Sequence, residues 1–360
     1  MYIVLAILMF SFLIFIHELG HFTTAKLFGV QVNEFSMFMG PALWKKQKGE
    51  TLYAIRTIPI GGYCAMEGED GESDNPRAFG RAKWWKKLII LVAGAAMNFI
   101  AGFLIFWFLF GTTPGYSNIP VPVISEFYEG NTIEGEHALQ VGDEILAIDG
   151  EKVYTTSNIS LLLNPRLGLA DEPGVHDVLV RRGGEKVMLE NLPMEPQVVH
   201  TEDGPRELYG MKLSTEPRTF LSGLEYSWNT TADTVRTVRL SLEMLLTGRA
   251  GFKDMGGPVM IVQTMTQTAE HSGSTMAAML NVLYFCAFIA VNLAVMNLLP
   301  IPALDGGRAV CVVLTAAWEG LTHKKINPKY EGYLHAAGMT VLLALMAVIT
   351  FKDIFNICRG

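Results

Sequence analysis

The sequence predicts a polytopic α-helical membrane protein, with a membrane-associated β-hairpin and an α+β domain inserted between its helices. Half of the 360 residues are hydrophobic and only 18% are charged, which is too apolar for a soluble protein of this length. Four apolar stretches account for the excess, and each is close to or longer than the ~20 residues that a spanning helix needs. The longest segment between them is acidic and has a strand-like pattern.

We predict transmembrane helices at residues 1–28, 88–110, 276–304 and 333–351. A cleaved signal peptide is the alternative for the first stretch. That stretch lacks a basic start, is too long, and has no small-residue cleavage site before its polar cluster. We therefore expect it to be retained as a spanning helix.

Basic residues gather in the loop between the first two spans and in the loop between the last two. By the positive-inside rule, both loops face the cytoplasm and both termini lie outside. Residues 112–222 hold 18 acidic against 8 basic side chains, which suits an extracytoplasmic domain. The basic residues are Lys45, Lys46, Lys48, Arg77, Arg81, Lys83, Lys86 and Lys87 in the first loop, and Lys324, Lys325 and Lys329 in the second.

These features divide the chain into four parts. Residues 1–112 and 276–360 form the two halves of a membrane core, residues 113–218 form the extracytoplasmic domain, and residues 219–275 connect it to the second half. In the connecting part, residues 220–246 show helical spacing of apolar side chains. This amphipathic helix either lies on the outer membrane surface or packs on the extracytoplasmic domain.

Residues 51–66 predict a β-hairpin in the first cytoplasmic loop. Apolar residues alternate with other residues around Ile55, Ile58 and Ile60, and the following Gly61 and Gly62 are typical of a turn. One interpretation is a plain surface hairpin. The other is an edge strand near a functional site, able to pair with the backbone of another chain.

The extracytoplasmic segment contains a motif that resembles the core of a PDZ domain. In ALQVGDEILAIDG, residues 138–150, a Gly-Asp pair turns the chain into a strand that ends at an Asp-Gly hairpin. Strands are expected at 121–128, 144–149, 176–182, 186–190 and 208–213, with a helix at 153–163. Such a domain either captures peptides by strand addition or acts as a size filter.

The first span carries the strongest chemical signal, the sequence His17-Glu18-Leu19-Gly20-His21. Histidines four residues apart lie on one helix face and can hold one metal ion, while the adjacent glutamate can act on water. Ionisable groups inside a membrane cost about 2.5–3.5 kcal/mol each, so a cluster there points to function. The pattern is typical of a zinc hydrolase.

A catalytic zinc ion takes three protein ligands, and Asp305 is the best candidate for the third. It follows the third span, after Pro300 and Pro302 and before a Gly-Gly pair, where irregular backbone is expected to line a cavity. The alternative role for Asp305 is an N-cap of a helix over residues 307–318. His335 is a rival ligand, ranked behind Asp305 because no carboxylate or second histidine is expected to support it within helical reach.

The chain resembles the site-2 protease family of intramembrane zinc metalloproteases, in particular its bacterial RseP-type branch with a single PDZ domain. His17, Glu18 and His21 match the family HExxH motif, and Leu304-Asp305-Gly306 matches its LDG motif. The resemblance implies one zinc ion per chain, held by His17, His21 and Asp305, with Glu18 as the catalytic base. Other matching segments are PIGGY at 59–63, GAAMN at 94–98 and GGP at 256–258, although Ala95 stands where a proline is common.

The resemblance also implies the substrates and partners. These are single-span membrane proteins, such as anti-sigma factors or signal-peptide remnants, trimmed beforehand by an upstream site-1 protease acting on the same substrate. Asn292 and Asn297 are expected to accommodate the substrate, and Gly61 and Gly62 to pair with its extended backbone. The implied location is the lipid bilayer of the bacterial inner membrane, and no nucleic-acid partner is expected.

Two other functional classes fit parts of the pattern. A catalytically silent membrane receptor would use the PDZ-like domain to bind exposed peptides, but would have no need for zinc. A zinc hydrolase acting on lipids or prenylated protein ends is the second alternative. The PDZ-like segment favours a peptide substrate.

Overall fold

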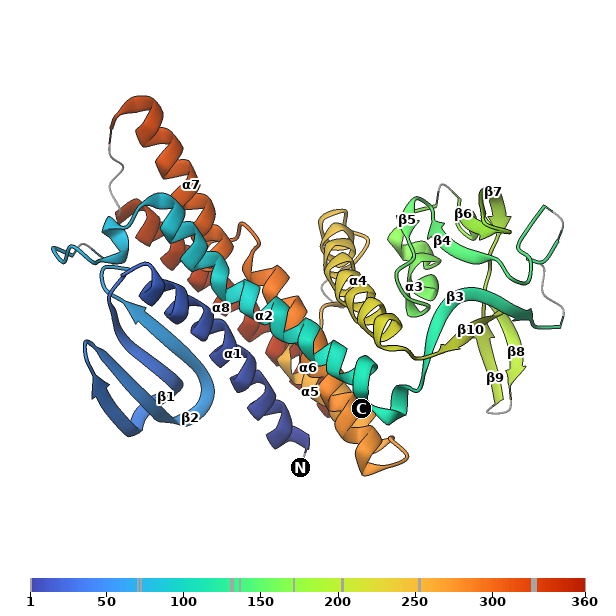
Figure 1. The fold of residues 1–360 in the computed structure, drawn as a ribbon, viewed down its shortest axis with the longest axis horizontal. Helices are drawn as coiled ribbons and strands as arrows, with labels where there is room; N and C mark the ends of the chain where they lie inside the picture. The colour runs from blue at the N-terminus through green and yellow to red at the C-terminus, as the bar shows by residue number, and fades with distance from the viewer. Residues whose placement is uncertain are drawn as a thin grey trace. The chain divides into compact units, whose positions relative to one another are not determined.

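The computed structural model describes residues 2–69, 71, 73–129, 133–135, 137–170, 172–201, 204–251, 254–324 and 329–359. Lys325, used above for orientation, lies outside these residues. The chain forms two compact units, Met1–Ile105 with Met255–Gly360, and Phe106–Asp254 (Figure 1).

The first unit is built mainly from helices. They are α1 (Tyr2–Leu27), α2 (Trp84–Thr112, which continues into the second unit), α5 (Pro258–Glu270), α6 (Thr275–Asn297), α7 (Asp305–Thr322) and α8 (Lys329–Arg359). A short 3-10 turn, Phe79–Arg81, precedes α2, and the two strands of this unit are β1 (Val32–Lys48) and β2 (Thr51–Met66).

Four helices are long and apolar enough to cross a membrane among the residues described. They are Val4–Leu27, Trp84–Thr112, Thr275–Asn297 and Tyr330–Asn356, which agree with the four predicted spans. The third helix ends at Asn297, before the predicted limit at residue 304. Pro300 and Pro302 cannot continue a helical hydrogen-bond ladder, so the chain leaves the helix there.

Two buried clusters hold the first unit together. One joins α1 to α5 and α6 through Leu13, Met265 and Ala290, and the other joins α1 and α2 to the strands through Ala25, Ile90 and neighbouring side chains. The backbones of α1 and α2 come close at Gly20, where an added Cβ would lie 2.4 Å from the Ala93 carbonyl oxygen.

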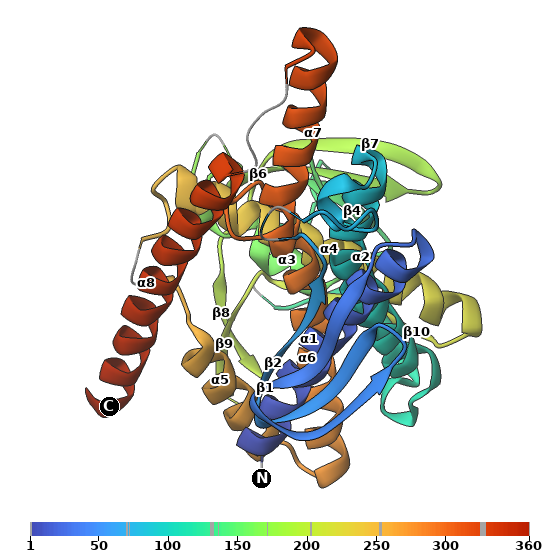
Figure 2. The same ribbon diagram turned by 90° about the vertical axis from the view of Figure 1, so that its left-hand side faces the viewer.

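The strands β1 and β2 form a sheet that lies along α1 (Figure 2). The tight turn between them is at Gly49 and Glu50, and Gly61 and Gly62 lie inside β2. The prediction of a hairpin turning at Gly61 was therefore wrong about the turn. The glycines signalled a local irregularity instead, because Gly61 has a φ of 81° and the register shifts nearby.

The first half of β1 occupies the middle of this sheet. Phe35 pairs with Cys64 on one side and with Tyr53 on the other. Arg56 ties the segments together, because its guanidinium donates to the Glu34 carboxylate at 2.6 Å and to the Tyr63 hydroxyl at 2.7 Å. The segment around Gly62 to Cys64 is consequently an outer strand of the sheet.

The second unit contains a six-stranded sheet and a separate two-stranded one. The strand order of the larger sheet is β10-β3-β4-β6-β7, with β5 paired to β4, and β8 pairs with β9. The strands are β3 (Asn118–Phe127), β4 (Glu144–Ile148), β5 (Glu151–Lys152), β6 (Val175–Arg182), β7 (Glu185–Pro193), β8 (Gln197–Thr201), β9 (Gly204–Leu208) and β10 (Met211–Pro217). The remaining elements are α3 (Ser157–Leu162), α4 (Phe220–Leu246) and 3-10 turns at Pro114–Tyr116 and Pro165–Leu167.

The first four predicted strands are found with small shifts at their ends, and α3 is shorter than the helix predicted at 153–163. The strand predicted at 208–213 spans the break between β9 and β10. The Gly-Asp pair is fixed by buried Asp143, which accepts from the Gln140 N–H at 2.9 Å and from the Arg182 guanidinium at 2.7 Å. The neighbouring Asp143 carboxylate raises the pKa of Arg182 above its usual value. At the Asp-Gly hairpin, Asp149 and Gly150 both have positive φ, as a type I′ turn requires.

The amphipathic helix α4 packs on the second unit. Leu240 is 3% exposed and belongs to the core of that unit. Arg236 donates to the Lys152 carbonyl, and Arg239 pairs with Glu151. Of the two alternatives for this helix, the structure supports packing on the inserted domain.

Candidate metal centre

Three potential ligands come together from the two ends of the chain. His17 and His21 lie on one face of α1, and Asp305 is the first residue of α7. The Asp305 Oδ2 atom lies 3.0 Å from His17 Nε2 and 3.3 Å from His21 Nε2, and the two Nε2 atoms are 3.1 Å apart. Among the residues described, this is the one cluster of at least three such side chains found.

The triangle of donor atoms has the size of a zinc site. For metal–ligand bonds of about 2.0–2.1 Å, the edge of a tetrahedron is about 3.3–3.4 Å. The three measured separations, 3.0, 3.1 and 3.3 Å, are close to this value. Two imidazoles and one carboxylate are also a donor set that zinc prefers, and they leave a fourth position open. The residues therefore fit a catalytic zinc ion.

Neighbouring groups contact both imidazole rings. The Nδ1 atom of His21 lies 2.8 Å from the Ile90 carbonyl oxygen, which accepts a hydrogen bond from the Nδ1–H group and leaves the Nε2 lone pair facing the site. The amide groups of Asn98 and Asn297 lie 3.5 and 3.4 Å from His17 Nδ1. The contact with the Ile90 carbonyl fixes the orientation and tautomer of the His21 ring, whereas the two amides are polar neighbours of the His17 ring.

A glycine allows α2 to approach the histidines. A Cβ added at Gly94 would lie 2.4 Å from His21 Nε2 and 2.7 Å from His17 Cε1. Gly94 and Asn98 are four residues apart and therefore share the face of α2 that meets α1. The GAAMN segment thus supplies both the close approach and a polar neighbour for His17.

Asp305 does not cap a helix with its side chain. The helix α7 has Leu304 at its N-cap position, without a side-chain capping bond, and the Asp305 carboxylate turns toward the histidines. The capping alternative was therefore wrong.

His335 does not join the cluster, because its Nδ1 accepts a hydrogen bond from the Ala303 N–H at 3.0 Å. The expectation that no carboxylate lies within its helical reach was wrong. Glu331 stands one turn earlier on α8, and its carboxylate lies 4.0 Å from His335 Nε2. The conclusion that His335 ranks behind Asp305 as a ligand agrees with the observed geometry.

Glu18 lies between the histidines in sequence and faces the sheet. Its carboxylate accepts a hydrogen bond from the Cys64 N–H, and a Cβ added at Gly62 would lie 3.9 Å from Glu18 Cγ. Burial raises the pKa of the Cys64 thiol far above its usual range, so Cys64 stays protonated and does not compete as a nucleophile. Of the Glu18 carboxylate and the Cys64 thiol, the carboxylate is therefore the group suited to accept and return a proton.

The two asparagines of α6 have different surroundings. Asn297 contacts His17, whereas the Asn292 amide donates to the Phe288 carbonyl of its own helix at 2.9 Å. Five residues correspond to about 500° of helical rotation, so the two side chains lie on different faces of α6. Asn292 is therefore not in contact with the cluster in this structure.

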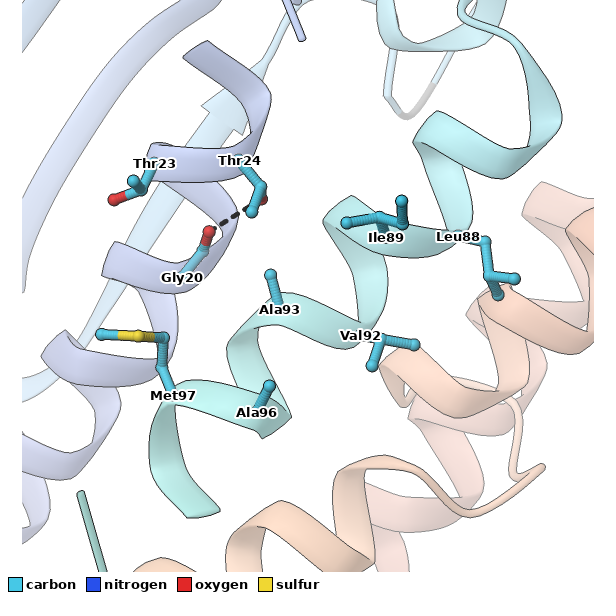
Figure 3. A pocket seen from close by; sticks show the side chains of 9 residues that line it. All are labelled: Gly20, Thr23, Thr24, Leu88, Ile89, Val92, Ala93, Ala96 and Met97. Atoms are coloured by element: carbon cyan, nitrogen blue, oxygen red, sulfur yellow. Dashed lines mark hydrogen bonds between the residues drawn. The ribbon is translucent and has the colours of Figure 1, made fainter. Parts of the chain in front are cut away.

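An apolar groove of about 550 Å³ lies beside the cluster, lined by α1 and α2 (Figure 3). Its polar side chains are Thr23 and Thr24, whose hydroxyls donate to carbonyls of α1 at 2.7 and 2.8 Å. The groove therefore offers hydrocarbon contacts and little hydrogen bonding. Its lining residues are Gly20, Thr23, Thr24, Leu88, Ile89, Val92, Ala93, Ala96 and Met97.

Comparisons with known proteins agree with this geometry. Residues 5–345 match the model of peptidase family M50. A protein of Clostridium perfringens that is named as a zinc metalloprotease is 36% identical over 355 residues, covering 98% of each chain. The regulator of sigma-W protease RasP of Bacillus subtilis is 26% identical over 432 residues, covering 97% of each chain. A protein of Helicobacter pylori named as a zinc metalloprotease is 30% identical, with 98% of each chain covered.

The match extends over the helices that carry both histidines and the aspartate, and it includes most of the chain. The names of two of these relatives describe them as zinc metalloproteases, in agreement with a donor set that fits zinc. This chain therefore belongs to peptidase family M50, the site-2 protease family, and is a membrane-associated zinc metalloprotease.

Proposed function

We propose that this protein is an endopeptidase that cleaves the membrane-spanning segments of single-span proteins within the bilayer. One observation carries the proposal: His17, Glu18 and His21 lie inside a helix that is long and apolar enough to span a membrane. A peptide bond reaching these residues would lie at membrane depth. Soluble substrates would have to enter hydrocarbon first, which charged chains do at high cost.

The proposed chemistry assigns one task to each group. His17, His21 and Asp305 would hold a zinc ion, which would act as a Lewis acid toward a carbonyl oxygen and water. Glu18, at the edge of the cluster, takes a proton from the attacking water and returns it to the amine that leaves. The Ile90 carbonyl holds the His21 imidazole in the orientation that presents Nε2, and the Asn98 amide lies beside the His17 ring.

The outer strand of the sheet is proposed to hold the substrate in an extended form. A helical substrate shields its peptide bonds with its own hydrogen bonds, so a segment must unwind before attack. The backbone of Cys64 contacts Glu18, and Gly62 is two residues away on the same outer strand. An extended peptide paired with this edge would run past Glu18.

We further propose that the second unit is an extracytoplasmic PDZ-like filter. By the positive-inside rule, the basic loops support a location of both termini and of this acidic unit outside the cytoplasm. The filter would admit proteins already trimmed by an upstream protease, such as anti-sigma factors or signal-peptide remnants, at the bacterial inner membrane. The name of the relative RasP, a regulator of sigma-W protease, supports an anti-sigma substrate.

The decisive experiment compares purified parent protein with Glu18→Gln, using a short single-span reporter at matched zinc content. The parent is expected to cleave the reporter within its span, and Glu18→Gln to be slower by about 10²–10⁴-fold, as for loss of a general base. Glu225→Gln on an exposed face of α4 makes the same chemical change elsewhere and should match the parent.

Three readouts separate the outcomes. Mass spectrometry of the products locates the cut, zinc analysis shows that the variant keeps its metal, and a zinc chelator should abolish cleavage by the parent. Equal rates for the parent and Glu18→Gln would remove Glu18 from the mechanism. A cut outside the reporter's span would contradict intramembrane cleavage.

A further inference from the structure

The loop that leads to Asp305 contains a residue in an unusual conformation. Ala303 has a φ of 85°, in the left-handed region that residues with a Cβ avoid. Such a conformation persists only where its surroundings impose it. The contacts that hold Ala303 in this conformation also affect the position of Asp305, which follows two residues later.

The helix α8 supplies these contacts. His335 is 8% exposed, and its Nδ1 accepts the Ala303 N–H at 3.0 Å. One turn further, a Cβ added at Gly338 would lie 2.5 Å from Pro302 Cβ and 2.7 Å from its carbonyl oxygen. His335 and Gly338 are three residues apart, so one face of α8 holds Pro302 and Ala303 from the side.

The rest of the loop is folded tightly onto the start of α7. A Cβ at Gly306 would lie 2.4 Å from the Leu298 carbonyl, and one at Gly307 would lie 2.2 Å from the Ile301 carbonyl oxygen. The loop has little room to adjust within itself. A shift at Ala303 would therefore be passed on to Asp305, whose Oδ2 must stay about 3 Å from both histidines.

We propose that His335 is a positioning residue for the zinc site: by accepting the Ala303 N–H, it fixes the left-handed turn that directs Asp305 toward His17 and His21. His335 acts from a helix that supplies none of the three ligands, and it makes no contact with the metal. This inference rests on the proposed role of Asp305 as a ligand.

The test measures zinc affinity by chelator competition, and the visible spectrum of the cobalt-substituted protein, for the full-length chain in detergent. His335→Leu removes the acceptor and should weaken zinc binding by about 10–100-fold, as for other residues that orient metal ligands. His335→Asn places an amide oxygen near the position of Nδ1 and should recover most of the affinity. His137→Leu makes the same change at an exposed position and should match the parent.

A second variant distinguishes positioning from packing. Glycine adopts a φ of 85° without a steric penalty, so Ala303→Gly should restore part of the zinc affinity when combined with His335→Leu. If the single variant does not fold, His335→Asn and the double variant still allow the comparison. The proposal is wrong if His335→Leu keeps parental affinity and spectrum, or if neither His335→Asn nor the added Ala303→Gly restores any affinity.

Asp305→Ala separates this inference from the proposed ligand set. Loss of zinc binding in Asp305→Ala, with parental binding in His335→Leu, would overturn the positioning role alone. Parental zinc binding in Asp305→Ala would overturn the ligand role itself.

Discussion

A glycine, which has no side chain, is important for the geometry of the zinc site. Gly94 brings the backbone of α2 against both imidazoles, where there is no space for even a methyl group. The same helix contributes the Ile90 carbonyl that orients His21 and the Asn98 amide next to His17. The position of α2 is therefore part of the geometry of the metal centre.

We expect Gly94→Ala to weaken zinc binding by at least about tenfold, because the new methyl group would force the histidine rings out of position. Gly332→Ala on α8 is a matched control, since nothing lies within 4 Å of its added Cβ. Chelator competition measures both variants. Parental affinity in Gly94→Ala would mean that α2 moves away without cost.

The three residues of the cluster were predictable from sequence as candidate ligands, whereas the way in which their neighbours orient them was not. Histidine and aspartate inside apolar segments are conspicuous because their burial is costly, so chemistry alone singles them out. The family resemblance included Gly94 in the GAAMN segment but did not give its role, because Gly94 and His335 act through distances between helices, and such distances have no local sequence signal. His335 in particular was weighed as a ligand, and the structure shows it bound to a loop.

At the scale of elements, the sheet of β1 and β2 brings a strand edge to Glu18. Gly62 has neighbours on two sides, because its added Cβ would lie 3.0 Å from the Ser36 carbonyl oxygen of β1 and 3.9 Å from Glu18 Cγ. A branched side chain there would crowd both β1 and Glu18 and would displace the strand. The strand is further anchored where Ser11 donates to the Pro59 carbonyl at 2.8 Å.

Gly62→Val is expected to lower the rate of reporter cleavage by about tenfold or more while leaving zinc affinity at the parental level, because it displaces the strand and not the ligands. Gly71→Val, at a site with open space around it, is the matched control. Assays of cleavage and of metal content are run on the same preparations. Unchanged cleavage would argue against a role for this edge in holding substrate.

The alternation of apolar residues correctly indicated strand structure in this loop, but its partner was missed. The strand β1 contains Lys45, Lys46 and Lys48, which sequence analysis used only to infer orientation. Register depends on long-range pairing, such as Phe35 with both Cys64 and Tyr53, and no local pattern encodes that choice.

At the scale of the whole molecule, the sheet of the second unit is inserted through a narrow connection. Asn118 pairs with Pro217, and the Arg218 N–H donates to the Ser117 carbonyl at 2.9 Å, so the segment begins and ends at one place. A short linker can therefore replace it. The helix α4 would lose its packing partner, because Leu240 is buried in the core of this unit.

Replacing residues 119–216 with a short Gly-Ser linker should allow cleavage of a reporter that still carries its bulky outer domain. The parent should cleave only the trimmed form of that reporter. Cleavage of the trimmed reporter by the deletion protein is the control for folding. If the deletion protein discriminates between the two reporters as strongly as the parent does, the second unit is not a size filter.

The two histidines and the aspartate lie near opposite ends of the chain, and this separation has a consequence for biosynthesis. A ribosome completes α1 long before it reaches Asp305. Until α7 has been synthesised and inserted, the nascent chain holds two of the three expected ligands and cannot close the site. A newly made molecule would therefore have no complete zinc site, and no activity that depends on one, until Asp305 has been synthesised.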